Sequence, residues 1–154
     1  MIEIVAEIES KVSNCCKVNT IRRGNFKVDI SKEVYPWIII DFDMKNAPLN
    51  YNQTKPDFLF VSSIGGLNNS GRVIPIEISK GRSKSAEKIR NQLQAGSDWA
   101  HKVMRHNFQP KLIPLYCGLL SKSTRRNLKS CRIKFRGQKV IPRIVSRNAS
   151  LPKQ

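Results

Sequence analysis

Three short apolar segments followed by one long amphipathic segment constrain the fold of this chain more than any other feature. Residues 37–42, 58–61 and 72–79 are rich in β-branched and aromatic side chains, which predicts buried strands. A loop over 64–71, rich in glycine and asparagine, joins the last two, so we expect them to pair as a hairpin. Residues 85–106 then carry apolar side chains at steps of four and three, the period of a helix that packs on a core.

Shorter patterns predict the remaining elements. They are a helix over 2–12, strands over 26–30 and 112–117, a short basic helix over 121–128, and strands over 132–136 and 139–145 that pair about Gly137. This order predicts an α/β fold in which helices pack on a mixed sheet. We expect one domain over residues 1–154, with a core of about 1–118 and a basic, strand-rich C-terminal extension of about 119–154.

The net charge of +17 is confined to one half of the chain. Residues 1–78 contain nine basic and nine acidic residues, whereas residues 79–154 contain nineteen basic and two acidic ones. Such a one-sided excess attracts polyanions and predicts a nucleic-acid partner. An anionic membrane surface is less favoured, because no basic segment has a strongly apolar opposite face. The expected phosphate-binding residues are Lys84, Lys88, Lys122, Arg125, Arg126, Lys129, Arg132, Lys134 and Arg136.

Several other classes of protein are disfavoured. No segment approaches the roughly 18 to 20 apolar residues of a membrane span. The first residues are acidic and lack the basic-then-apolar order of a signal peptide, so we expect an intracellular, cytoplasmic protein. The four cysteines form no CxxC pair and the two histidines are five residues apart, which predicts reduced thiols rather than a zinc site.

Two acidic residues stand out by their positions. Asp57 follows Pro56 directly before one predicted strand, and Glu77 lies in the next strand, with Lys80 close behind. If the two strands pair, both carboxylates come together at one edge of the sheet. Two carboxylates that face solvent suit Mg²⁺ or Mn²⁺. Such a metal activates water and stabilises negative charge on a phosphate, and a nearby lysine adds positive charge.

The run Pro56-Asp57, then Ile76-Glu77-Ile78-Ser79-Lys80, then a helix with Gln92, resembles the PD-(D/E)xK nuclease superfamily. Restriction endonucleases and Holliday-junction resolvases belong to it. The resemblance covers roughly residues 55–118 and implies a restriction-endonuclease-like αβββαβ core, a central mixed sheet flanked by helices. It also implies that Asp57 and Glu77 ligate magnesium and that a lysine assists the attacking water. Some members carry a glutamine on the following helix, and Gln92 is the better candidate here, because it flanks the buried stripe while Gln94 points further out. The implied activity is metal-dependent endonucleolytic hydrolysis of DNA, with RNA left open as a substrate.

The spacing of the acid and the lysine departs from the family pattern. The family separates them by one residue, but two residues separate Glu77 from Lys80, so in a regular strand Lys80 points away. A β-bulge would return Lys80 to the site, or Lys84 or Lys88 would replace it. The alternative is an inactive site, and hence a non-catalytic basic nucleic-acid-binding protein on a degenerate nuclease fold. A homodimer would supply the two active sites that cutting both strands calls for.

Other candidate residues favour structural roles. Asp41 and Asp43 share one face at the end of a strand, where a solvated strand end is favoured over a metal site. For Glu7, an orientation toward the site is less favoured than a structural role. Trp37 and Trp99 are expected in the core rather than stacked on bases.

Overall fold

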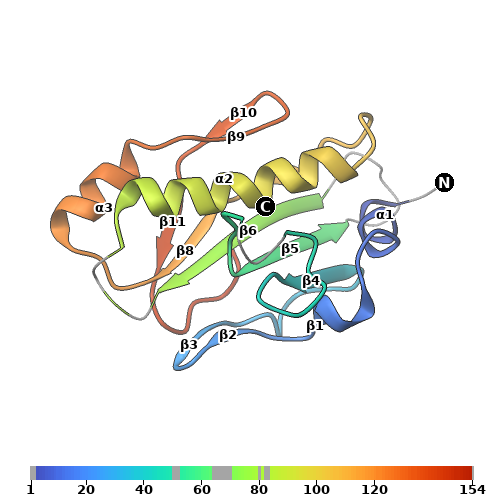
Figure 1. Ribbon diagram of the computed structural model, residues 1–154, viewed down its shortest axis with the longest axis horizontal. Coiled ribbons are helices and arrows are strands. Elements are labelled where there is room, and N and C mark those ends of the chain that lie inside the picture. The colour runs from blue at the N-terminus through green and yellow to red at the C-terminus, as the bar shows by residue number, and fades with distance from the viewer. Residues whose placement is uncertain (1–2, 50–52, 64–70, 80, 82–83, 154) are drawn as a thin grey trace.

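The fold is an α/β arrangement with a central mixed sheet of seven strands and three α-helices in the described part of the chain (Figure 1). The computed structural model describes residues 3–49, 53–63, 71–79, 81 and 84–153. All of the predicted turn over 64–71 except Gly71 lies outside the described residues, and so does Lys80.

In chain order the elements are α1 (Ile4–Glu9), the 3-10 turn η1 (Asn14–Cys16), β1 (Lys17–Val18), β2 (Ile21–Arg23), β3 (Phe26–Val28), β4 (Trp37–Asp41), β5 (Phe58–Ser63), β6 (Gly71–Ser79), α2 (Ala86–Val103), β7 (Lys111–Leu112), β8 (Leu115–Gly118), α3 (Lys122–Lys129), β9 (Ile133–Phe135), β10 (Gln138–Val140) and β11 (Arg143–Val145). In the described residues, six strands lie between α1 and α2, and two strands separate α2 from α3.

The sheet has the order β1-β4-β5-β6-β8-β11, and β7 also pairs with β6. Strands β4, β5 and β6 are antiparallel neighbours, which confirms the predicted pairing of β5 with β6. Strands β8 and β11 run parallel to β6, because α2 carries the chain back across the sheet before β8 begins. Two short hairpins, β2–β3 and β9–β10, lie outside this sheet.

Both faces of the central strands are covered, so these strands are apolar almost throughout. Helices α1 and α2 cover one face, where Leu59 and Val73 belong to the core. The β2–β3 hairpin and the C-terminal segment around Leu151 cover the other face, where Ile74 and Ile76 lie. The result is three layers, with the sheet between helices and hairpin.

Helix α2 confirms the predicted amphipathic helix. Ser85 caps its N-terminus by accepting a hydrogen bond from the backbone N–H of Lys88 at 3.1 Å. The apolar stripe, including Ile89, Leu93 and Ala100, is buried against the sheet. Within the described residues, no helix has the length and apolar character needed to cross a membrane.

Two predicted strands are corrected by the structure, both at prolines. The strand over 112–117 is broken at Pro114 into β7 and β8, because proline has no N–H for the ladder. The segment 139–145 is not one strand paired with 132–136. Only Gln138–Val140 pairs with β9 about Gly137, and after Pro142 the chain joins the main sheet as β11 beside β8. Strand β2 was not predicted.

Gly96 lets α2 approach the sheet closely at the start of β5. A Cβ atom at this position would lie 2.8 Å from Cγ of Pro56 and 3.0 Å from Cβ of Pro75. Both neighbours are proline rings, which cannot rotate out of the way. The contact therefore fixes α2 directly above the residue that precedes Asp57.

We expect Gly96→Ala to destabilise the protein by about 1–2 kcal/mol, because overpacking against the two prolines exceeds the gain in helix propensity. Urea denaturation of the variant and the wild type measures the difference. Lys102→Ala, an exposed change on the same helix, is the control and is expected to alter stability by less than about 0.5 kcal/mol. Equal stability of Gly96→Ala and wild type would contradict the close packing.

Candidate active site at the end of the central strands

The structure brings Asp57 and Glu77 together. The register of β5 and β6 pairs Leu59 with Pro75 and Phe58 with Ile76, so Asp57 is the next residue opposite Glu77. Because side chains alternate along a strand, both carboxylates lie on the face that carries Leu59 and packs against α2. They lie near one end of two central strands of the sheet rather than on an edge strand.

Glu77 is more deeply buried than Asp57. Only 2% of the residue is exposed. Its Oε2 atom accepts a hydrogen bond from Nζ of Lys84, whereas Oε1 has no hydrogen-bond partner among the described residues. Burial raises the pKa of Glu77 to about 8; the carboxylate of Asp57 also raises it, and Lys84 opposes the increase.

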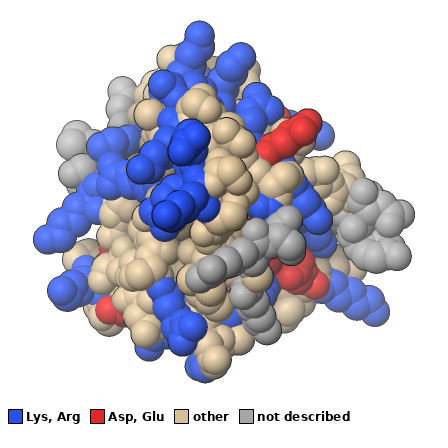
Figure 2. Space-filling view, turned by 90° about the vertical axis from the view of Figure 1, so that its left-hand side faces the viewer, with Lys and Arg blue, Asp and Glu red and all other residues tan. Residues whose placement is uncertain are grey.

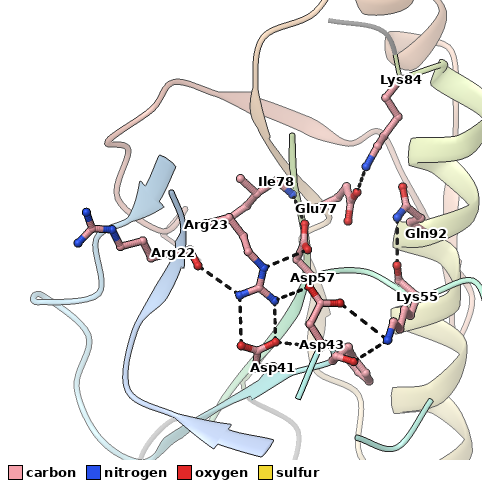
Figure 3. Close-up of polar contacts among 11 residues, drawn as sticks. Arg22, Arg23, Asp41, Asp43, Lys55, Asp57, Glu77, Ile78, Lys84 and Gln92 are labelled. Carbon is pink, nitrogen blue, oxygen red and sulfur yellow. Dashed lines mark hydrogen bonds and ion pairs between the residues drawn. The ribbon is translucent and has the colours of Figure 1, made fainter. Parts of the chain in front are cut away.

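Asp57 is held from two sides. Its Oδ2 atom accepts a hydrogen bond of 2.7 Å from the backbone N–H of Ile78, and its Oδ1 atom accepts one of 3.3 Å from Nε of Arg23 (Figure 3). The same guanidinium pairs with Asp41 at 2.6 Å and with Asp43 at 3.0 Å. The prediction of a solvated strand end at Asp41 is therefore wrong, because Arg23 binds and covers this carboxylate.

The lysine beside the carboxylates is Lys84. It lies just before α2, and its ammonium group reaches Glu77 from the helical layer (Figure 3). Lys80 lies outside the described residues. Lys88, in the first turn of α2, is exposed and lines the pocket beside Asp57.

Gln92 faces the site and Gln94 does not. The side-chain nitrogen of Gln92 donates to the backbone carbonyl of Lys55 at 3.2 Å, and its Oε1 atom is buried without a hydrogen-bond partner in the described structure. Gln94 instead bonds with the backbone of Lys134 on β9. A pocket of about 500 Å³ opens beside Asp57 between the segment before β5 and the first turns of α2, and Gln92 lines it.

Most of the predicted phosphate-binding residues gather at the same end of the molecule. Strands β6 and β8 are parallel, so the segments that follow them emerge at one end of the sheet, and α3 follows β8. Figure 2 shows many lysine and arginine side chains over this end. The exposed members of the set are Lys88, Lys122, Arg125, Arg126, Lys129, Arg132 and Lys134.

Arg136 does not belong to this exposed set. Its guanidinium donates hydrogen bonds to the backbone carbonyls of residues 101, 104, 105 and 108, at and beyond the C-terminal end of α2. The carbonyl of His101 lies in the last turn of α2, where carbonyls lack a partner within the helix, so Arg136 caps the helix. Its guanidinium is therefore engaged within the fold, and phosphate binding by Arg136 stays a prediction.

Other predicted candidates lie away from the site. Glu7 pairs with Lys11 at 3.0 Å and with Arg105 at 3.2 Å, on a helix that packs at the Ser63 end of β5, opposite Asp57. Trp99 is buried and meets the ring of Phe42 edge-on. All four cysteines are free.

Any cation at this end would have to be held by few protein ligands. Among the residues that the structure describes, no group of three or more histidine, cysteine, aspartate or glutamate side chains could hold a metal ion.

Comparison with known proteins finds no relative: no family model, no curated protein and no solved structure matches the chain. The functional assignment therefore depends on the geometry of Asp57, Glu77 and their partners.

The pKa of Glu77 predicts a specific dependence of stability on pH. Its value of about 8 in the folded protein exceeds the ordinary value of 4.5, so between these values the folded state holds a proton that the unfolded state releases. This group therefore makes stability fall as pH rises from about 4.5 to 8. We expect Glu77→Gln to remove that loss, giving a melting temperature, measured in EDTA, that depends less on pH. Glu9→Gln, at an exposed residue, should leave the slope unchanged.

Proposed function

We propose that the protein is a metal-dependent endonuclease that hydrolyses DNA phosphodiester bonds on a restriction-endonuclease-like fold. The observation that carries the proposal is the pair Asp57 and Glu77, side by side, with one buried oxygen of Glu77 that no described group satisfies. Burying a carboxylate oxygen without a partner is costly, and such exceptions cluster at functional sites.

The order of elements supports this fold. The succession α1, β4, β5, β6, α2, β8 is the αβββαβ order of the PD-(D/E)xK nucleases, with three antiparallel strands followed by a parallel one. Asp57 directly precedes β5 and Glu77 lies on β6, the two strands that this resemblance designates. The hairpins β2–β3 and β9–β10 and strand β11 are additions to that core.

The residues present fit Mg²⁺ or Mn²⁺. Oε1 of Glu77 needs a positively charged or hydrogen-donating partner, and Asp57 lies beside it. Magnesium commonly takes one or two protein carboxylates and completes its coordination with water and substrate phosphate, so two ligands suffice. When bound, the cation supplies positive charge to the phosphate and lowers the pKa of water.

Lys84 takes the role that the family assigns to a lysine. Its ammonium group lies against Glu77, so it is close to the place where the two carboxylates meet. There it orients the attacking water and stabilises the negative charge that develops on the phosphate. Gln92, with its free buried oxygen, positions a hydrogen-bond donor of the substrate or a water molecule at the neighbouring pocket.

The exposed basic residues of α3 bind the phosphate backbone of the substrate. The helix presents Lys122, Arg125, Arg126 and Lys129 at the end of the sheet where the carboxylates lie. Contacts of this kind provide affinity without sequence readout, so the preference for sequence is expected to be modest.

A second function, nucleic-acid binding without catalysis, is favoured by the ion pairs of the site. Arg23 pairs with Asp57 and Lys84 pairs with Glu77, so both carboxylates have a cationic partner without a metal. A degenerate site of this kind would retain the basic surface and its affinity.

Cleavage of plasmid, branched DNA and RNA with Mg²⁺, Mn²⁺ or EDTA tests the first function. We expect metal-dependent cutting of DNA that falls by at least about 100-fold in Asp57→Asn, Glu77→Gln and Lys84→Gln, since each removes a ligand or a charge. Glu87→Gln, at an exposed carboxylate that also lines the neighbouring pocket, is the matched control and should retain activity. Tight DNA binding with no cutting under any condition would instead establish the second function.

A further inference from the structure

The β2–β3 hairpin lies at the same end of the molecule as the carboxylates but in the layer opposite α2 (Figure 1). A pocket of about 430 Å³ at its turn is lined by Gly24, Asn25, Phe26, Leu119 and Arg147. Leu119 follows β8 and precedes the N-cap of α3 by two residues. The hairpin turn therefore lies beside the segment that joins β8 to α3.

Two like charges face each other across the hairpin. Arg22 is the register partner of Lys27, and both side chains are exposed. Like charges directly opposite on neighbouring strands destabilise a sheet. Neither side chain forms an ion pair with a described residue, in contrast to Arg23 and Lys55 nearby, which both pair with aspartates. An anionic ligand would remove this repulsion.

Arg147 adds a third positive charge beside the turn of the hairpin. The backbone N–H of Lys27 donates to the carbonyl of Arg147 at 2.9 Å, which holds the segment after β11 alongside β3. The guanidinium of Arg147 lies 5.2 Å from the centre of the Phe26 ring, and the residue is exposed. The acidic residue closest in sequence to Lys27 is Asp29, whose carboxylate accepts hydrogen bonds from the backbone and the side chain of Ser31.

The strand that carries Arg22 also carries a residue of the site. Successive side chains of β2 point to opposite sides, so Arg22 faces solvent while Arg23 reaches Asp57. The guanidinium of Arg23 lies over the ring of Phe58, with Cζ of Arg23 4.2 Å from the ring centre. The side chain of Arg23 thus links the β2–β3 hairpin to the Asp57 carboxylate.

We propose that the β2–β3 hairpin is a second phosphate-binding surface, formed by Arg22, Lys27 and Arg147, which binds the nucleic-acid backbone on the side of the site opposite α3. This proposal rests on the proposed function and extends it. The substrate lies across the end of the sheet, with the carboxylates between two basic surfaces. The class of ligand is a polynucleotide long enough to contact both surfaces.

The test is binding of a labelled DNA duplex in EDTA, over a series of salt concentrations, by three double variants. Arg22→Ala/Lys27→Ala removes charge from the hairpin, and Arg125→Ala/Arg126→Ala removes the same charge from α3. Lys32→Ala/Lys153→Ala is the matched control, because both lysines line a pocket at the Ser62–Ser63 end of β5, opposite Asp57. Thermal denaturation of each variant establishes that it remains folded.

We expect the hairpin variant to bind about tenfold more weakly near 0.1 M salt and to lose about 1 to 2 units of the slope of log affinity against log salt, as the α3 variant does. The control should bind like wild type. If the α3 variant weakens binding while the hairpin variant matches wild type, the hairpin proposal is overturned and the proposed function stands. If wild-type protein does not bind DNA at all, the proposed function itself fails.

Discussion

The register between β5 and β6 is the constraint on which the rest of the site depends. Pairing Phe58 with Ile76 places two carboxylates side by side on the face of the sheet that α2 covers. A shift of one residue would turn every side chain of a strand to the other face and separate them. The register is strongly determined, because the side chains of both strands are buried on both faces.

Two cations reach these carboxylates from opposite layers of the fold. Arg23 comes from the hairpin that covers one face, and Lys84 comes from the segment that begins the helical layer on the other. An ionised carboxylate in an apolar sheet is costly without such partners. Glu77 is the less well compensated of the two carboxylates. Burial and Asp57 raise its pKa, and its Oε1 atom has no described hydrogen-bond partner.

The sequence predicted what local periodicity and local spacing determine. Strands β4, β5 and β6, helix α2 with its Ser85 cap, and the nearness of Asp57 to Glu77 all follow from apolar patterns and one short loop. It did not predict Arg23, because no motif links this residue to an aspartate 34 positions away. The contacts of Arg136 with the end of α2 were not predicted for a similar reason, because they arise only in the folded chain.

The central claim is that Asp57 and Glu77 together hold a divalent cation, and diffraction from crystals soaked in Mn²⁺ tests it without reference to activity. The account predicts an anomalous peak in contact with both carboxylates, with Oε1 of Glu77 among its ligands, and no such peak in crystals of Glu77→Gln. Wild-type crystals without a peak between the two carboxylates, in which Arg23 still pairs with Asp57 and Lys84 with Glu77, would contradict it.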